Sequence, residues 1–446
     1  MKSAIISKSL LFFILVNIFS ASFSHAVLTY EEERVIDDAT IFNTFKEKKI
    51  VSKLSSIIEM INESLISNYL ADIVDFAPRT TGTYGCKKAG QYIYQVFNEI
   101  GLETRYHNWS SFGNRYNPRL FRSQNIEGIF QGTDENSDNI IIFNAHYDSV
   151  KGSPGADDDG SGVAAVLACA YVLSKFDFNN TIKLLCFSGE EEGLLGSNAY
   201  SKELYMKNDN IIIEFNADMI GYAKTKEHGQ KFRIYGTQDV DWYVDVIEDL
   251  NNQFEFNFNI TRGILSEDSR GGSDYSAFTR YGYEAIAFFE GQWNTNMHTK
   301  YDNLENVNIS YLTKTTQLIA VSIAYISDMI INYPFVRIES PKKGNLYFEG
   351  REKNDLKDKR DDQLRTVVID DFWIRADILN DFGTIEKVEF YYNGRLQFTD
   401  FEPPYKWHMN KISFFNRRIE VIAYDQYHRI AGDWIDILYI NPRIRD

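Results

Sequence analysis

Short apolar strands alternate with helical segments through the middle of the chain, and this alternation limits the possible folds more than any other feature. A parallel pair of strands needs a crossover of a dozen or more residues, which is usually a helix. The alternation therefore predicts an α/β fold with a mostly parallel central sheet and helices on both faces. The predicted strands are IEGIF, NIIIFNA, IKLLCF, NIIIEFNA, KFRIYG and EAIAFFE. The predicted helices cover residues 87–101, 161–175, 193–206, 239–252, 273–281 and 308–332.

Histidine and acidic side chains occur at the ends of these strands or in the loops after them. In open α/β sheets, ligands bind beyond the carboxyl ends of the strands. Two imidazoles and three carboxylates can hold two zinc ions, and one further glutamate can serve as a base. The residues are His146, Asp157, Glu190, Glu191, Asp218 and His298, in the segments NIIIFNAHYDSV, GADDDGSG, FSGEEEGLLGS, EFNADMIG and MHTKYDNL.

These five segments, in this order and spacing, resemble the metal-binding blocks of peptidase family M28, the co-catalytic zinc aminopeptidases. The resemblance covers about residues 50–330. In that family the first Glu of the E-E-x-G-L block is the general base, which implies this role for Glu190. The resemblance implies one zinc ion on His146 and Asp218, a second on Glu191 and His298, and Asp157 as the bridge between them.

The residues around these positions fit the same chemistry. Asp148 follows His146 by two residues, so it is placed to accept the second ring N–H and to orient the imidazole for catalysis. Glycines flank the acidic triplet, where they allow the backbone to approach metal ions and a helix to begin. The alternatives are a solvated turn for the triplet and a charge-stabilised helix N-terminus for residues 190–192.

The sequence indicates less clearly which residue would donate a hydrogen bond to the negatively charged substrate oxygen. The segment RGGSDYSAF, residues 270–278, lies where relatives of that family carry S-D-H, so Tyr275 stands in place of a histidine. A donor of this kind has to face the developing oxyanion. Tyr275 and Arg270 are the candidates, and a packing role is the alternative for Tyr275.

The N-terminus has the pattern of a secretory signal peptide at residues 1–26. Lys2 and Lys8 precede the apolar run LLFFILVNIF, and small residues lead to Ser24-His25-Ala26. The apolar run is shorter than the roughly 20 residues of a membrane-spanning helix. We therefore expect cleavage after Ala26, a secreted or periplasmic location, and no integral membrane segment in the mature chain.

The net charge limits the classes of binding partner, and the cysteine content limits the disulfide bonds that can form. The formal net charge is −16, which argues against nucleic acid or an anionic membrane as a partner. The family resemblance implies peptides as substrates. Cys86, Cys169 and Cys186 are the three cysteines, the second in an apolar helix and the third in an apolar strand. This placement predicts buried thiols and no disulfide framework. The sequence leaves the oligomeric state open.

The pattern changes near Pro334, where helical periodicity gives way to short strands and turns such as Asn393-Gly394. Residues 333–446 resemble the immunoglobulin-like β-sandwich modules of exported bacterial enzymes. A spacer or stabilising role is one interpretation, and binding of sugar, surface or substrate is the other. Of the fifteen residues 351–365, eleven are charged, which predicts a mobile loop. The predicted strands are VRIESP, NLYFEG, RTVVIDDFWIRADI, KVEFYYNG, PYKWHM, RRIEVIAYD and WIDILYI; His408 and His428 are interpreted as ordinary strand or turn residues.

The sequence therefore predicts a zinc-dependent exopeptidase domain at residues 27–332 that removes N-terminal residues from peptides. Glutaminyl cyclase shares the fold and an H-Y-D-S block but typically uses one zinc ion. The sequence also leaves open a carboxypeptidase of the same family and a non-catalytic binding protein on this fold.

The charges beside the blocks favour recognition of an amine. An aminopeptidase holds a free α-ammonium, for which Asp158, Asp159 and Glu192 offer spare carboxylates. A carboxypeptidase needs fixed cations for the terminal carboxylate, and Arg270 and Lys300 are the only basic residues immediately beside the blocks.

Overall fold

The computed structural model divides the chain into two compact units, Met1–Val51 and Ser52–Asp446. The described part of the first unit belongs to helix α2 (Asp38–Met60). The predicted signal peptide lies outside the described residues, as do Arg270 and His428. The structure describes residues 38–113, 117–207, 209–237, 240–265, 272–328, 336–342, 344–355, 366–378, 385–425 and 430–442, without the side chains of 38–48, 241, 354, 355, 425, 430 and 431.

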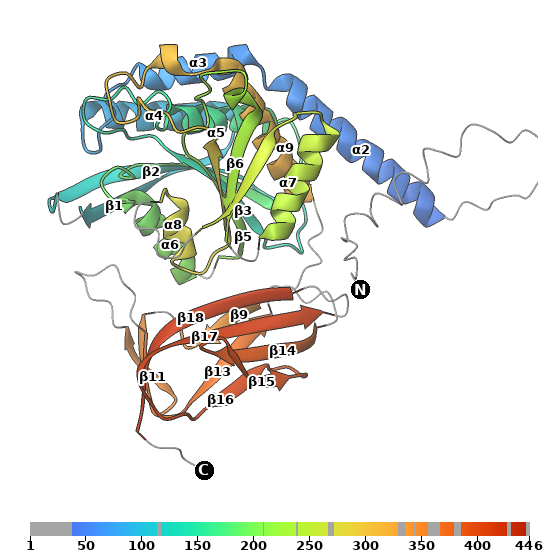
Figure 1. Ribbon diagram of the computed structural model, residues 1–446, viewed down its shortest axis with the longest axis vertical. Helices are drawn as coiled ribbons and strands as arrows, with labels where there is room; N and C mark the ends of the chain where they lie inside the picture. Colours follow the sequence, from blue (N-terminus) through green and yellow to red (C-terminus); the bar gives the residue numbers. More distant parts are fainter. Residues whose placement is uncertain are drawn as a thin grey trace, which may run out of the picture. The chain divides into compact units, whose positions relative to one another are not determined.

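An eight-stranded mixed sheet forms the centre of the α/β part (Figure 1). Its four central strands, β4, β3, β5 and β8, run parallel to one another. Antiparallel pairing appears only toward the edges, between β1 and β2, β2 and β4, and β6 and β8. The predicted fold class is confirmed. The strands, in spatial order, are β1 (Glu103–Phe112), β2 (Leu120–Phe130), β4 (Thr181–Phe187), β3 (Ile140–His146), β5 (Ile211–Ala217), β8 (Ala285–Glu290), β6 (Lys231–Gly236) and β7 (Asn259–Ile264).

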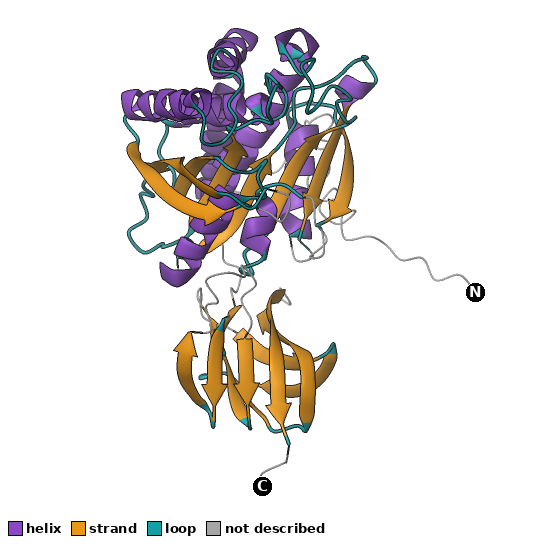
Figure 2. Ribbon diagram, turned by 90° about the vertical axis from the view of Figure 1, so that its left-hand side faces the viewer, coloured by secondary structure: helices purple, strands orange, loops and turns teal. Residues whose placement is uncertain are grey.

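Helices cover both faces of this sheet (Figures 1 and 2). On one face α5 packs against β3 and β4, α4 packs against β1 and β2, and α3 and α9 contact α5. On the other face α6 and α8 pack on apolar side chains of the central strands, including Ile142, Leu185 and Phe187. The helices are α3 (Glu63–Val74), α4 (Tyr84–Ile100), α5 (Gly160–Leu173), α6 (Leu195–Lys207), α7 (Asp241–Gln253), α8 (Tyr275–Thr279) and α9 (Ile309–Asp328), with short 3₁₀ turns at His228–Gln230 and Leu304–Asn306.

The sequence of each helix reflects its surroundings. Helix α5 is apolar around most of its circumference because it lies between the sheet and other helices, and all of its residues except Tyr171 are buried. Helix α4 buries one face only. It begins at the Thr83 cap, whose side chain accepts from Cys86 N at 3.4 Å, and it ends at Gly101, which has the left-handed φ of 93° that favours glycine.

Two strands of the sheet were not predicted from the sequence. β1 and β7 are the edge strands, and many of their side chains are exposed or half-exposed. An edge strand has a weak apolar pattern because it buries little of either face.

The C-terminal part is rich in β-strands, as predicted, and contains two further sheets. One apolar core, which includes Ile374, Trp407 and Val421, joins side chains from both sheets. The assignment to immunoglobulin-like modules stays a prediction. The seven-stranded sheet has the order β11 (Arg351–Asp355), β10 (Asn345–Phe348), β12 (Thr366–Ile369), β18 (Ile430–Asn441), β17 (Ser413–Asp425), β14 (Ile385–Tyr392) and β15 (Arg395–Asp400); the three-stranded sheet has the order β16 (Lys406–Met409), β13 (Phe372–Ile378) and β9 (Val336–Ser340).

Two details of this part differ from the prediction. The segment RTVVIDDFWIRADI is not one strand, because the chain turns at Asp370, with φ of 70°, and passes from one sheet to the other. Residues 351–355 of the predicted loop form β11, whereas residues 356–365 lie outside the described part.

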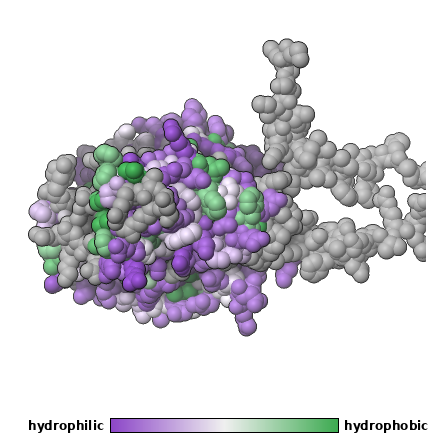
Figure 3. Space-filling view, turned by 90° about the horizontal axis from the view of Figure 1, so that it is seen from below, coloured by the Kyte–Doolittle hydropathy of each residue, from purple (hydrophilic) through white to green (hydrophobic). Residues whose placement is uncertain are grey.

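Figure 3 shows a surface seen from below, with hydrophilic residues over most of the coloured area and smaller hydrophobic areas between them.

Two sequence predictions concern the chain as a whole. Cys86, Cys169 and Cys186 are buried and free, as predicted. Among the described residues, no helix combines the length and the apolar character needed to cross a bilayer.

Candidate metal centre

The predicted ligand residues come together at the carboxyl ends of the parallel strands. His146 is the last residue of β3, and Asp218 directly follows β5. Glu190 and Glu191 follow β4, the other neighbour of β3. His298 lies in the loop after β8, with an unusual positive φ of 62°. Positive φ in a non-glycine residue is uncommon and is found more often at functional sites.

Two groups of ligand atoms share one carboxylate, that of Asp158. One Asp158 oxygen lies 3.2 Å from His146 Nε2, and the other lies 3.0 Å from His298 Nε2. His146 Nε2 also lies 3.8 Å from Asp218, and His298 Nε2 lies 3.2 Å from Glu191. Within each group, the ligand atoms lie within 4.8 Å of one another. The structure thus has two adjacent groups of potential ligands that share one carboxylate.

The carboxylate common to both groups is that of Asp158, whereas the sequence pointed to Asp157 as the bridge. Asp157 is fully buried, and its side chain is committed elsewhere. Its Oδ1 accepts from Gly221 N at 3.0 Å, and its Oδ2 accepts from Asn294 Nδ2 at 2.9 Å. Burial raises the pKa of Asp157 to about 6. It links the acidic loop to the segment after β5 and to the loop that carries His298.

Asp159, the third member of the triplet, has a structural role. Its carboxylate accepts from Gly162 N at 2.9 Å and so caps α5. The same carboxylate accepts from His146 N at 3.1 Å and from Met219 N at 3.2 Å, which ties the ends of β3 and β5 together. Asp159 is fully buried. The sequence suggested Asp159 as a spare carboxylate for a substrate ammonium, but its oxygens already accept hydrogen bonds within the protein.

Asp148 lies beside the His146 ring, but its main-chain oxygen is closer to the ring nitrogen than the carboxylate that the sequence pointed to. His146 Nδ1 is 3.2 Å from the main-chain oxygen of Asp148 and 3.7 Å from its carboxylate. The carboxylate also accepts from Thr81 Oγ1 at 2.7 Å and from Glu190 N at 3.3 Å. Asp148 thus contacts the ring that carries one proposed ligand atom and the backbone of the proposed base. These contacts fit an orienting role.

Two residues that the sequence did not single out hold the acidic loop in place. Asp302 is fully buried and accepts from Asp157 N at 2.9 Å and from Asp158 N at 3.1 Å. Arg79, also fully buried, donates to the main-chain oxygens of Tyr147 (2.7 Å), Pro154 (2.8 Å) and Gly155 (2.8 Å). Asp302 could have been found from the sequence, because it belongs to the T-K-Y-D run after His298. The loop around Arg79 contains no motif that points to a role for this residue.

The glycines of the acidic loop are needed for this packing. Gly155 has φ of 64°, and a Cβ there would lie 2.7 Å from Asp158 O. A Cβ on Gly162 would lie 2.5 Å from both carboxylate oxygens of Asp159. The glycines thus allow the loop to pack tightly, and α5 begins directly after the triplet, as predicted. The approach of the backbone to metal ions stays a prediction.

Burial and neighbouring acids affect the electrostatics of Glu190. Burial raises the pKa of Glu190 well above its usual range, and the negative charges of Asp218, Asp274 and Glu191 add to this effect. The opposing influence comes from His146. Asp274 is itself fully buried, and burial raises its pKa to about 7. The neighbouring carboxyl groups thus make Glu190 bind a proton more readily than an ordinary glutamate does.

The remaining candidates occupy less central positions. Tyr275 is buried at the start of α8, among Leu265, Ala285 and Phe289, which fits the packing alternative. Glu192 accepts from Asn117 Nδ2 at 2.7 Å. Lys300 is exposed, with its Nζ 5.0 Å from the centre of the Tyr301 ring.

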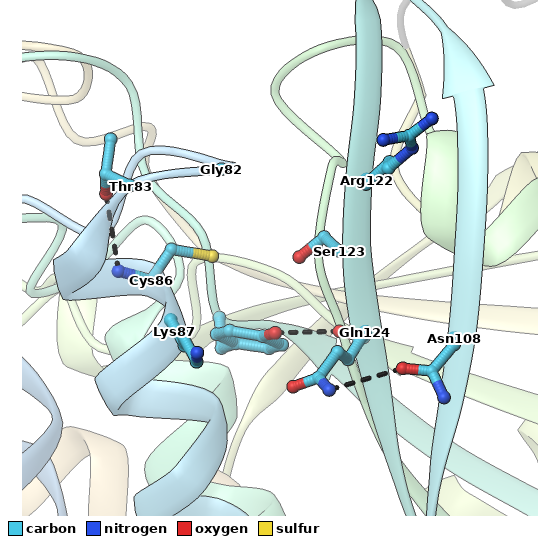
Figure 4. Close-up of a pocket in the computed structure, with 9 residues that line it drawn as sticks. Gly82, Thr83, Cys86, Lys87, Asn108, Arg122, Ser123 and Gln124 are labelled. Carbon is cyan, nitrogen blue, oxygen red and sulfur yellow. Dashed lines mark hydrogen bonds between the residues drawn. The ribbon is translucent and has the colours of Figure 1, made fainter.

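A separate cavity of about 300 Å³ lies between α4 and the β1–β2 pair (Figure 4). Its lining includes Cys86 and Lys87 of α4, Gln124 of β2, and Tyr147, whose hydroxyl donates to Gln124 O at 2.7 Å. None of the predicted metal ligands lines it.

Comparison with known proteins points to one family of peptidases. Residues 125–323 match the model of peptidase family M28. Aminopeptidase YwaD of Bacillus subtilis is 30% identical over 212 residues, which are 45% of this chain and 44% of that protein. The chain thus matches less than half the length of that relative. These matches support an M28 peptidase.

Solved structures show the same fold. LapB from Legionella pneumophila has a TM-score of 0.53 at 20% identity, with 61% of this chain and 74% of that chain covered. BSAP, a zinc aminopeptidase from Bacillus subtilis, has a TM-score of 0.52 at 18% identity, with 61% and 98% covered.

Proposed function

We propose that this chain is a zinc-dependent aminopeptidase that binds two zinc ions. One observation carries the proposal: the two oxygens of Asp158 face two different histidines, and each histidine faces a further carboxylate. A carboxylate shared in this way is the bridge that a two-metal site requires. The aminopeptidase names of the relatives support the choice of reaction.

The donor set fits zinc. Each ion would have one imidazole nitrogen, one carboxylate of its own and an oxygen of Asp158, which are ligand types that zinc prefers. Three protein ligands per ion leave room for substrate or water. His146 is buried whereas the His298 side chain is 48% exposed, so the cluster opens to solvent on the His298 side.

Glu190 is the proposed base and acid of the reaction. When bound, the ions would polarise the scissile carbonyl and make a water molecule a stronger nucleophile. Glu190 would take the proton from that water and later deliver it to the leaving amine. Asp148 accepts from Glu190 N and contacts His146, so it keeps the base and one ligand in register.

The acidic surroundings favour a positively charged substrate end. Glu190 lies near the proposed ligands Glu191 and Asp218 but would not itself bind an ion, so its negative charge would attract an ammonium group and repel a terminal carboxylate. Lys300 points to the Tyr301 ring and is exposed. This balance supports amine recognition and hence cleavage at the N-terminus.

The test uses one short peptide in three forms: unmodified, N-acetylated and C-terminally amidated. We expect the unmodified and amidated forms to be cleaved and the acetylated form to resist cleavage. Chelation should abolish activity, and added zinc should restore it with two ions per chain by elemental analysis.

Other results would favour different functions. Cleavage that is lost on amidation alone would show a carboxypeptidase. A single zinc ion, together with cyclisation of peptides that begin with glutamine, would show a glutaminyl cyclase. A protein that binds neither metal nor peptide in these assays would refute the proposal.

A further inference from the structure

Three polar side chains interrupt the apolar strands β3 and β5 near the metal cluster. Asn144, Glu214 and Asn216 are all fully buried. Central parallel strands usually read as continuous apolar runs, and a buried polar group is costly unless it is hydrogen-bonded. The presence of three such groups therefore calls for a physical explanation.

The three side chains bond to one another across the two strands. Asn144 Nδ2 donates to Glu214 Oε1 and, at 3.1 Å, to the main-chain oxygen of Phe215. Asn216 Nδ2 donates to Asn144 Oδ1 at 3.0 Å. Asn144, Glu214 and Asn216 thus form a side-chain ladder between β3 and β5.

The ladder lies where the two strands begin to separate. The main-chain pairing of β3 with β5 ends at Asn144 and Asn216. His146 and Asp218 lie two residues further along the chain from each of these positions. Beyond the ladder, Asp159 links the two strand ends, because it accepts from His146 N and Met219 N. The strand ends are therefore tied once before the metal ligands and once beside them.

We propose that Glu214 is a positioning residue for metal binding: through Asn144 and Asn216 it fixes the separation of His146 and Asp218. The inference rests on the proposed function, since it assumes that those two residues hold a zinc ion. Zinc–ligand bonds of about 2.0–2.2 Å tolerate little displacement of the ligands. Loss of a group that supports a ligand typically weakens metal binding about 10–100-fold.

The effect should be confined to one side of Asp158. Glu191 follows β4 and His298 follows β8, and neither residue has a hydrogen bond to the ladder among the described contacts. A purely structural role for Glu214 would lower stability without separating the two zinc sites. The distinction between the sites is therefore the decisive observation.

The experiment compares the full chain with three variants: Glu214→Leu, Glu214→Gln and Tyr200→Phe. Leucine removes the acceptor for Asn144, whereas glutamine keeps it. Tyr200→Phe is the matched control, because it removes another buried hydrogen bond on the α6 side of the sheet, from the Tyr200 hydroxyl to Glu127. Zinc affinity is measured at both sites by competition with a chromophoric chelator, and thermal stability is measured in parallel.

We expect Glu214→Leu to weaken one of the two zinc sites about 10–100-fold and to recover kcat when zinc is saturating. Glu214→Gln should bind zinc within a few-fold of the unmodified chain. Tyr200→Phe should melt earlier but keep both zinc affinities. If Glu214→Leu does not fold, Asn144→Ala opens the same ladder and carries the same expectation.

Unchanged zinc binding in the ladder variants, or equal weakening of both sites, would overturn the inference while leaving the proposed function intact. An unmodified chain that binds no zinc would instead overturn the proposed function. The two failures are thus distinguished by the same titration.

Discussion

Substitution of asparagine for Asp157 or Asp158 replaces one carboxylate oxygen by an amide NH₂ group. The two variants test which of these residues bridges the proposed zinc ions. In Asp157→Asn, one of the two donors that now meet its carboxylate, Gly221 N and Asn294 Nδ2, loses its acceptor. A buried donor without a partner costs about 1–3 kcal/mol. We expect this variant to be less stable but to keep its zinc. In Asp158→Asn, the charge that faces His146 and His298 is lost, and zinc binding should weaken by at least about 100-fold, the upper value for loss of a supporting residue.

The assay is the shift in melting temperature that zinc produces in each variant. At a zinc concentration of 100 times the Kd, binding stabilises the folded state by about 2.7 kcal/mol. With an unfolding entropy of about 2.1 cal/mol/K per residue, this corresponds to a shift of about 4 °C for a domain of roughly 300 residues. A 100-fold weaker site would retain only about 0.4 kcal/mol at the same concentration. Each variant is compared with its own zinc-free form, so the destabilisation of Asp157→Asn does not enter the comparison. A full zinc shift in Asp158→Asn, with none in Asp157→Asn, would refute the assignment.

Four other predictions test the base, the loop support, the domain boundary and export. Glu190→Gln should lower kcat about 10²–10⁴-fold with normal zinc content, and loss of zinc in this variant would instead identify Glu190 as a ligand. Arg79→Met leaves three main-chain oxygens without their buried donor; at about 1–3 kcal/mol for each, we expect a loss of about 3–9 kcal/mol in unfolding free energy, measured by urea denaturation, and an unchanged midpoint would contradict it. Residues 27–332 alone should fold and cleave small peptides, so an insoluble or inactive fragment beside an active full chain would show that the C-terminal part is needed. N-terminal sequencing of exported protein should begin at Val27.

The central strands were predictable from the sequence because both of their faces are buried. β3, β4, β5 and β8 read as short apolar runs, and the ligand residues follow them at positions that the pattern marks. The edge strands β1 and β7 were missed for the opposite reason. Their side chains are largely solvent-exposed, so neither the apolar run of a buried strand nor strict alternation is present.

The choice within the acidic triplet could not be made from the sequence. In a strand or helix, the period fixes the direction of each side chain, but residues 157–159 lie in a turn where each backbone conformation is set separately. The contacts that decide the directions come from distant parts of the chain, such as Asp302, which accepts from both Asp157 N and Asp158 N. The sequence therefore marks the triplet but does not determine which of its members faces the two histidines.

The triplet also shows why three adjacent carboxylates are not interchangeable ligands. A metal bridge has to present two free oxygens, and each hydrogen bond from a backbone N–H occupies a lone pair that a metal would use. Asp157 and Asp159 accept such bonds from Gly221, Gly162, His146 and Met219. The Asp158 carboxylate instead faces the two imidazoles. Asp157 and Asp159 hold the loop to α5 and to the segment after β5. The carboxylate that would bind the ions therefore belongs to Asp158, and the contacts that position this carboxylate belong to its two neighbours.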